Sequence, residues 1–347
     1  MSYPQAARGP VLYDFRSDTV TRPNNAMRAA MAAAEVGDDV WGDDPTVIRL
    51  QAVAAELLGF EAGLFVPSGT QSNLIGLMCH CQRGDEYLVG QDAHTYKYEG
   101  GGAAVLGSIQ PQPIENANDG SLPIDKLKKA VKPDDAHFAR TRLLALENTI
   151  GGKVLPADYV KAATDWAHGI GLATHLDGAR IWNAAVASGK TPADIAAGFD
   201  SVSVCLSKGL GAPVGSVLLG SRDLIAQGKR WRKMLGGGMR QAGIVAAAGL
   251  YALEHNIARL ADDHANAARL AAGLAQLPGL TVSSQTNMVF VQVETSIATA
   301  FATHLAEAGL LVSSIGTAQR WVTHLDVDTA AVDAAISIAS RFFAGRA

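Results

Sequence analysis

The most informative segments of the chain are Leu172-Ala-Thr-His-Leu-Asp-Gly-Ala-Arg180 and Ser201-Val-Ser-Val-Cys-Leu-Ser-Lys-Gly-Leu-Gly211. Each begins as a short apolar run, typical of a buried strand, and ends in charged residues and glycine. Asp177 and Lys208 are 31 residues apart, which leaves room for a strand–helix–strand crossover. Open α/β sheets place ligands at the carboxyl ends of their strands. The two stretches therefore predict a parallel sheet with a site at that edge.

Similar apolar runs recur along the chain. The predicted strands are Gly63–Val66, Glu86–Val89, Ala104–Ile109, Leu143–Leu146, Leu172–His175, Ser201–Leu206 and Gly215–Leu219. Most are separated by the predicted helices Gln71–Cys81, Pro123–Val131, Ala157–Gly169 and Gly178–Ala187. This alternation predicts an α/β fold with a mostly parallel central sheet and helices on both faces. The loop between the last two strands is too short for a parallel crossover, so we expect one antiparallel strand.

The pattern differs at both ends of this core. Upstream, helices are expected over Asn25–Glu35 and from Asp44-Pro45 onward, where an acidic cap precedes proline. Beyond about Met239 the expected elements are Arg240–Glu254, Asn256–Leu277, Met288–Val293, Ser296–Ala308, Leu310–Val312, Trp321–Thr323 and a final helix. We therefore predict a loose arm over residues 1–12, a large domain over 13–250 and a smaller α+β domain over 251–347.

Composition excludes several classes of protein. Of the 347 residues, 48% are hydrophobic and 18% are charged, and the formal net charge is −4. These values exclude a disordered chain and argue against a nucleic-acid binder. The longest apolar run, Ile244–Leu253, is far shorter than the roughly 20 residues of a membrane span. Residues 1–15 lack the apolar region of a signal peptide, so we expect no secretory signal. Three cysteines are too few for a disulfide framework. We expect a cytoplasmic protein that does not bind membranes.

Asp177 and Lys208 provide a carboxylate and an amine, the two groups that an aldehyde cofactor with a pyridine ring requires. A lysine followed by glycines can approach a cofactor aldehyde and form a Schiff base. A nearby aspartate can pair with a protonated pyridine nitrogen. Taken singly, the two residues could be a surface lysine and a helix-capping aspartate. Together, at the ends of two strands, they favour the cofactor interpretation.

A phosphate site is suggested by Val66-Pro-Ser-Gly-Thr-Gln-Ser-Asn73, which links a strand to a helix. Gly69 and Thr70 would leave free N–H groups at the helix start. Ordinary capping by Ser68 or Thr70 explains the same residues. The glycines of Gly209-Leu-Gly-Ala-Pro-Val-Gly215 do not match a dinucleotide motif in spacing or context, and no Walker-type motif is present.

Histidines provide further candidates. His94 follows the predicted strand Glu86–Val89, and His137 lies in a loop before the next strand. Imidazole accepts a proton near neutrality, although isolated histidines are more often structural. Cys79-His80-Cys81 does not predict a metal site, because adjacent helical residues point to different faces. We expect no metal.

Taken together, the motifs resemble the L-threonine aldolases, pyridoxal-phosphate enzymes of the aspartate-aminotransferase-like fold (fold type I). The matching segments are Phe15-Arg-Ser-Asp-Thr-Val-Thr-Arg-Pro23, Val36-Gly-Asp-Asp-Val-Trp-Gly-Asp-Asp-Pro45, Pro67-Ser-Gly-Thr-Gln71, His175-Leu-Asp-Gly-Ala-Arg180, Ser207-Lys-Gly-Leu-Gly211 and Gly236-Gly-Gly-Met-Arg-Gln241. The resemblance extends from about Asp14 to Phe343 and is strongest to the low-specificity bacterial members. Trp41 departs from it, standing where many relatives have tyrosine.

The resemblance implies a role for each candidate residue. Lys208 resembles the Schiff-base lysine, Asp177 the partner of the pyridine nitrogen and Arg180 the partner of the ring hydroxyl oxygen. The phosphate would be held by Gly69, Thr70 and Arg240, with help from Lys233. His94 resembles the histidine stacked on the cofactor ring, and His137 a second histidine near the substrate side chain. Ser17 and Arg320 resemble the groups that hold the substrate carboxylate.

The implied activity is reversible cleavage of L-threonine or L-allo-threonine to glycine and an aldehyde. The alternatives are another pyridoxal-phosphate lyase of this fold or a hydroxymethyl transferase acting on a small amino acid. The resemblance also implies a homo-oligomer, a dimer or a dimer of dimers, in which Arg240 lies near the cofactor of a partner.

Overall fold

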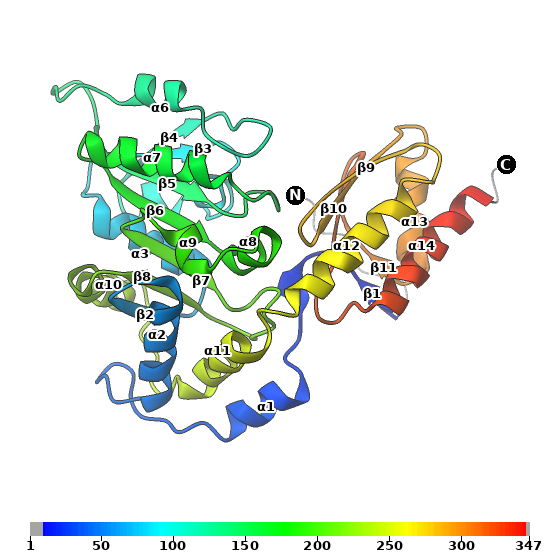
Figure 1. The fold of residues 1–347 in the computed structure, drawn as a ribbon, viewed down its shortest axis with the longest axis horizontal. Helices are drawn as coiled ribbons and strands as arrows, with labels where there is room; N and C mark the ends of the chain where they lie inside the picture. Colours follow the sequence, from blue (N-terminus) through cyan, green and yellow to red (C-terminus); the bar gives the residue numbers. More distant parts are fainter. Residues whose placement is uncertain (1–9, 345–347) are drawn as a thin grey trace. The chain divides into compact units, whose positions relative to one another are not determined.

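The computed structural model describes residues 10–344 (Figure 1). The chain divides into two compact units. The large unit contains Pro23–Ser207 and Ala212–Glu254, and the described part of the small unit contains residues 10–22, Lys208–Gly211 and residues 255–344. Residues 1–9 of the predicted N-terminal arm lie outside the described residues. Within those residues, no helix combines the length and apolar character needed to cross a lipid bilayer.

The large unit is built on a seven-stranded sheet. Its spatial order is β2 (Ala62–Val66), β8 (Ser216–Gly220), β7 (Ser201–Cys205), β6 (Ala173–Gly178), β5 (Arg140–Glu147), β3 (Asp85–Gly90) and β4 (Gln110–Ile114). All strands run parallel except β8, which is antiparallel to both of its neighbours. The predicted α/β class, the mostly parallel sheet and its single antiparallel strand are confirmed. The carboxyl ends of the parallel strands therefore share one edge.

Helices surround this sheet. They are α1 (Asn25–Ala32), α2 (Pro45–Leu58), α3 (Gly69–His80), α4 (His94–Lys97), α5 (Gly102–Val105), α6 (Ile124–Ala130), α7 (Ala157–Gly169), α8 (Ile181–Ser188), α9 (Pro192–Ala196), α10 (Arg222–Met234) and α11 (Gly243–His255). The expected cap at α2 is present, because the Asp44 side chain accepts a hydrogen bond from Val47 N and Pro45 begins the helix. Helices α3 and α10 bury Ile75 and Ile225 against Leu64 and Leu218 of the sheet.

The small unit has its own sheet and core. Four antiparallel strands lie in the order β12 (Ser313–Ile315), β13 (Ala318–Val322), β10 (Met288–Val293) and β9 (Leu280–Gln285). Its helices are α12 (Leu260–Leu274), α13 (Ala298–Glu307) and α14 (Thr329–Ala344), and β1 (Tyr13–Asp14) pairs in parallel with β11 (Leu310–Leu311). Phe15, Phe301 and Trp321 are fully buried in the core. Residues 13–22 belong to this small unit.

One predicted strand is wrong. Residues 104–109 are expected to form a strand, but α5 ends within them, and the strand β4 begins only at Gln110. The sequence does not predict β4 because Pro111 and Pro113 argue against a strand. Both are tolerated because β4 is an edge strand that pairs with β3 alone, so a missing N–H can face away from the sheet. The sequence also does not predict the charge-rich helix α10, the mostly polar strand β9, or the short elements α4, α5, α9, β1 and β12.

Candidate active site

The carboxyl edge of the large sheet brings together residues from strands far apart in sequence. Asp177 lies near the end of β6, Glu147 ends β5, and His94 begins α4 just after β3. The helix α3 starts at the same edge, directly after β2. Because these four strands run parallel, their carboxyl ends share one edge, and that edge holds a cluster of polar side chains.

Asp177 is the buried centre of this cluster. It is 2% exposed. Its Oδ1 accepts a hydrogen bond from Ala179 N at 3.0 Å, and its Oδ2 accepts one from Asn73 Nδ2 at 2.9 Å. Asn73 Nδ2 also donates to Glu99 Oε1 at 2.9 Å, so one amide joins two carboxylates. The donors keep Asp177 fixed in direction, as a partner of a protonated ring nitrogen requires.

A chain of buried hydrogen bonds leads away from Asn73. Its Oδ1 lies 3.2 Å from His175 Nε2, His175 Nδ1 lies 2.8 Å from Ser201 Oγ, and Ser201 Oγ lies 2.7 Å from His80 Nε2. Burial lowers the pKa of His175 to about 3 and that of His80 to about 4, so both rings are neutral at neutral pH. A neutral imidazole has one N–H donor and one acceptor nitrogen. Because Asn73 Oδ1 can only accept, His175 donates to Asn73, Ser201 donates to His175, and His80 donates to Ser201.

The periodicity of two elements explains this chain. His175 and Asp177 are two residues apart in β6 and face the same side of the sheet. Asn73, Gly76 and His80 are three to four residues apart in α3 and form one stripe of that helix. Gly76 is required in the stripe, because a Cβ there would lie 2.6 Å from His175 Cε1.

His94 joins the cluster through its main chain and its ring. Its backbone N donates to Glu147 Oε2 at 2.7 Å, and its Nδ1 lies 2.9 Å from Glu99 Oε1. The side chain is 40% exposed, whereas that of Glu99 is 4% exposed. The ring is therefore held at Nδ1 by a buried carboxylate, while part of the side chain is exposed. Sequence reasoning does not identify six members of this network as candidate site residues: Asn73, Glu99, Glu147, His175, Ser201 and His80.

The start of α3 has the properties of a phosphate cradle. Ser68 caps the helix by accepting a hydrogen bond from Gln71 N. A Cβ on Gly69 would lie 3.6 Å from Ser216 Oγ, a buried hydroxyl without a hydrogen-bond partner among the described residues. The positive end of a twelve-residue helix, a glycine and an unsatisfied hydroxyl fit a phosphate group. With Asp177 for a ring nitrogen, the large unit fits pyridoxal phosphate at both ends of the cofactor.

The other predicted cofactor ligands are basic residues at the end of α10, in the loop that follows it, and at the start of α8. Gly237 packs so closely on Gln71 that a Cβ would clash, which places this loop against the first turn of α3. Lys233 belongs to the last turn of α10. Arg240 Nη1 lies 3.0 Å from Asp38 Oδ2. Arg180 is the N-cap residue of α8, three residues after Asp177.

Three predicted site residues belong to the small unit. The Lys208 carbonyl accepts a hydrogen bond from Gly211 N at 2.8 Å, and Arg259 Nη1 donates to Gly209 O at 3.3 Å, so the lysine loop is held by its backbone. Ser17 Oγ accepts a hydrogen bond from Thr19 N at 3.3 Å. Arg320 Nη2 donates to the carbonyl of Arg16 at 3.3 Å. Arg16 directly precedes Ser17, so this hydrogen bond holds Arg320 close to the Ser17 backbone.

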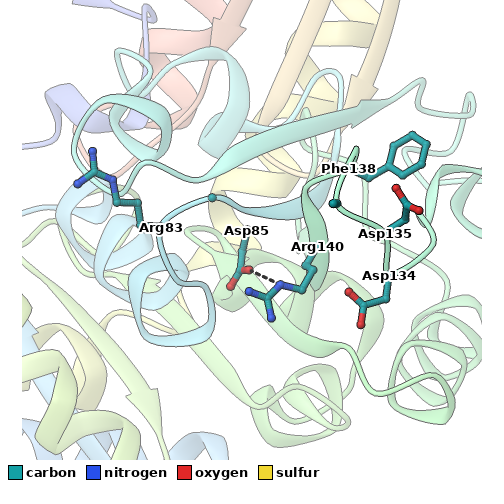
Figure 2. Close-up of a pocket in the computed structure, with 8 residues that line it drawn as sticks. Arg83, Asp85, Asp134, Asp135, Phe138 and Arg140 are labelled. Atoms are coloured by element: carbon teal, nitrogen blue, oxygen red, sulfur yellow. Dashed lines mark ion pairs between the residues drawn. The ribbon is translucent and has the colours of Figure 1, made fainter.

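His137 is separated from the cluster. It lies in the loop before Arg140, the first residue of β5, and is therefore at the amino edge of the sheet. Its neighbours Asp134, Asp135 and Phe138 are labelled in Figure 2. They line a hollow of about 400 Å³ at this edge. The His137 side chain is 86% exposed, and its Nδ1 lies 2.6 Å from Asp135 Oδ1. At roughly 3.3 Å per residue, β5 puts about 20 Å or more between His137 and the cluster of the same chain.

The chain is similar to known enzymes over most of its length. The profile of the family described as beta-eliminating lyase matches residues 14–296. The low-specificity L-threonine aldolase of Escherichia coli (strain K12) is 57% identical over 316 residues, which cover 91% of this chain and 95% of that protein. The probable low-specificity L-threonine aldolase 2 of Arabidopsis thaliana is 48% identical over 289 residues, covering 81% of each protein.

Solved structures share the fold. The threonine aldolase of Leishmania major matches with a TM-score of 0.82 at 20% identity, covering 95% of this chain and 99% of that one. A putative L-allo-threonine aldolase from Listeria monocytogenes matches with a TM-score of 0.78 at 22% identity, covering 95% of this chain and 96% of that one.

Proposed function

Because the chain belongs to the threonine aldolases of the beta-eliminating lyase family, we propose that it cleaves L-threonine and L-allo-threonine to glycine and acetaldehyde with pyridoxal phosphate. The reaction is a reversible retro-aldol cleavage, and other β-hydroxy-α-amino acids would release the corresponding aldehyde. The observation that carries this proposal is the buried Asp177 at the carboxyl edge of the sheet, with the start of α3 and Ser216 at the same edge.

Several residues would hold the cofactor. Asp177 keeps a proton on the pyridine nitrogen, because an opposite charge favours the protonated ring. Gly69 and Thr70 offer backbone N–H groups to the phosphate. Lys208 supplies the amine for covalent attachment. The remaining cofactor ligands in the proposal are Arg180, Lys233 and Arg240. When bound, the cofactor withdraws electrons from the Cα of the substrate, which makes the Cα–Cβ bond breakable.

Other residues act on the substrate. Ser17 and Arg320 bind its carboxylate and thereby fix the direction of the Cα–Cβ bond. His94 accepts the proton of the β-hydroxyl, which releases the aldehyde. His137 contacts the substrate side chain in this proposal. Because His137 lies at the opposite edge of its own sheet, it would have to act in the site of a second copy of the chain.

We also propose that the active unit is a homo-oligomer, at least a dimer and in the fuller form a dimer of dimers, located in the cytoplasm. An apolar surface supports the assembly: Trp41 is 82% exposed and Met234 is 65% exposed. Both line a hollow of about 670 Å³ that also contains Lys233 and Gly238. Exposed apolar patches of this kind often mark protein interfaces. A fully active monomer in light scattering at the assay concentration would contradict the shared site.

The decisive experiment is an assay of purified, cofactor-loaded protein on L-threonine, L-allo-threonine and D-threonine. We expect glycine and acetaldehyde in equal amounts from the two L-substrates and none from D-threonine. Ammonia and a 2-oxo acid instead of glycine would indicate an eliminating lyase. Activity only with a one-carbon carrier and L-serine would indicate a hydroxymethyl transferase.

A further inference from the structure

Glu99 is a carboxylate in the segment between α4 and α5 that the chain buries almost completely. Its side chain is 4% exposed. Burying a carboxylate costs free energy unless hydrogen-bond donors surround it. Two donors reach the same oxygen: Glu99 Oε1 accepts from Asn73 Nδ2 at 2.9 Å and lies 2.9 Å from His94 Nδ1. Two nitrogens converging on one oxygen are typical of an ionised carboxylate acting as acceptor.

The orientation of Asn73 supports this assignment. Its Oδ1 accepts from His175 Nε2, so its Nδ2 must point toward the two carboxylates. Each of the two Nδ2 hydrogens then has its own acceptor, Glu99 Oε1 and Asp177 Oδ2, both at 2.9 Å. The direction of the buried chain from His80 is thus consistent with Glu99 Oε1 accepting the hydrogen bond from Asn73 Nδ2.

We propose that Glu99 is a positioning residue that holds the imidazole of His94 with its proton on Nδ1. A neutral imidazole protonated at Nδ1 has its acceptor lone pair on Nε2. The carboxylate also stabilises the imidazolium formed when Nε2 takes up a proton, as the aspartate does in a serine-protease triad. This inference rests on the proposed function, since it concerns the residue proposed to accept the β-hydroxyl proton.

The groups around Glu99 and His94 determine how the pair titrates. The pKa of Glu99 is raised overall: burial raises it most, the hydrogen bond of His94 lowers it, the charge of Asp177 raises it, and the hydrogen bond of Asn73 lowers it. Tyr87 on β3 also faces Glu99, Glu147 accepts from the His94 backbone, and the Tyr98 ring lies 5.8 Å from the His94 ring. Because Asp177 and Glu147 are present in every variant below, they contribute equally to all of the comparisons.

The first measurement is the ¹⁵N NMR spectrum of histidine-labelled protein, recorded with and without pyridoxal phosphate. The His94→Asn variant identifies the His94 signal. We expect the proton of the neutral ring on Nδ1 in the wild-type protein. A ring protonated on Nε2 would overturn the proposal, because Glu99 would then be donating rather than accepting. The readout does not depend on turnover.

The second measurement is the pH dependence of kcat on L-threonine. Glu99→Gln keeps the size of the side chain but removes its charge, so we expect a fall in kcat of roughly 10–100-fold with KM within a few-fold. The acid limb of the profile should move to lower pH, because an imidazolium without an anionic neighbour loses its proton more readily. Glu99→Asp restores the charge and should return the limb toward its wild-type position.

Glu86→Gln is the matched control. Glu86 is a fully buried carboxylate in β3 that pairs with Lys132 and accepts from Thr141, away from the carboxyl edge. Its loss can reduce stability, but it should leave the acid limb unmoved. A Glu99→Gln variant that melts earlier yet keeps the wild-type limb would reduce Glu99 to a packing role. Nδ1 protonation in a wild-type protein that makes no glycine would instead contradict the aldolase proposal alone.

Discussion

The two edges of the seven-stranded sheet carry similar side chains in opposite settings. At the carboxyl edge, His94 lies 2.9 Å from Glu99, which is buried and bonded to further side chains. At the amino edge, His137 lies 2.6 Å from Asp135, and both side chains are more than half exposed. Figure 2 shows Asp135 at this second edge, on the rim of an open hollow. The shorter contact is thus the more exposed one.

Contact distance alone therefore does not identify the functional edge. An exposed ion pair contributes about 0–1 kcal/mol, because water and salt screen it and two mobile side chains must be ordered. A buried polar group left without its partner costs about 1–3 kcal/mol, so every member of the carboxyl-edge cluster depends on the others. Burial and connection to a network distinguish the two edges.

The largest effect is expected for Lys208→Ala. Lys208 is the proposed point of covalent attachment, and it follows the carboxyl end of β7 by three residues. We expect no measurable cleavage of L-threonine and no visible absorption band in protein loaded with pyridoxal phosphate. Lys190→Ala, which changes a lysine elsewhere in the chain, is the control and should retain both. Wild-type turnover in Lys208→Ala would remove this lysine from the proposed mechanism.

The next largest effect is expected for His94→Asn, which we compare with His137→Asn at the opposite edge. His94→Asn should lower kcat on both threonine diastereomers by roughly 10²–10⁴-fold, the usual cost of losing a general base. His137→Asn should mainly raise KM or change the ratio of threo to allo cleavage. Steady-state kinetics on L-threonine and L-allo-threonine measure both quantities. If kcat survives in His94→Asn and falls in His137→Asn, the two roles are reversed.

A smaller effect is expected for Gly76→Ala, which tests the buried hydrogen-bond chain behind the carboxyl edge. Gly76→Ala should destabilise the protein by about 1–3 kcal/mol, because the new methyl group meets the buried ring of His175. In an open helical position the same change would stabilise by up to about 1 kcal/mol. Gly169→Ala at the end of α7 is the matched control, since nothing lies within 4 Å of its Cβ position. Urea unfolding monitored by circular dichroism should separate the two variants in opposite directions.

The smallest effect is expected at the amino edge. Arg140 Nε lies 3.9 Å from Asp85 Oδ1, a long contact, and the arginine side chain is 59% exposed. The Asp85 side chain is buried, but it keeps a hydrogen bond from Gln82 N at 2.7 Å when the arginine is removed. Arg140→Ala should therefore change the free energy of unfolding by less than about 1 kcal/mol and leave kcat unaltered. A loss of several kcal/mol, or of turnover, would show that this edge is more than a solvated surface.

Much of the fold and part of the site could be predicted from local sequence. Strand–helix alternation predicts the parallel sheet, and the short connection before β8 predicts its antiparallel direction. Asp177 and His94 each follow an apolar run that reads as a parallel strand, and this position alone is enough to assign both to one edge. The strand β4 is missed because prolines usually argue against a strand, and only its position at the sheet edge makes them acceptable.

The partners of Asp177 could not be predicted because they come from tertiary packing. Asn73 is 104 residues away from it, and Glu99 lies in a segment without hydrophobic periodicity. Two local signals do point to these partners. His175 shares a strand face with Asp177, and Asn73, Gly76 and His80 share a stripe of α3. A glycine in the middle of a buried helix, flanked by polar residues on its own stripe, indicates that a side chain of another element occupies its place.

The prolines of β4 also bear on how the chain avoids aggregation while it folds. An exposed sheet edge offers unpaired N–H groups to strands of other molecules, which is a common route to aggregation. With Pro111 and Pro113 in alternate positions, the outer side of β4 lacks two of those donors. The sheet can thus end at β4 without a covering strand, and its growth into intermolecular β-structure is blocked from that side.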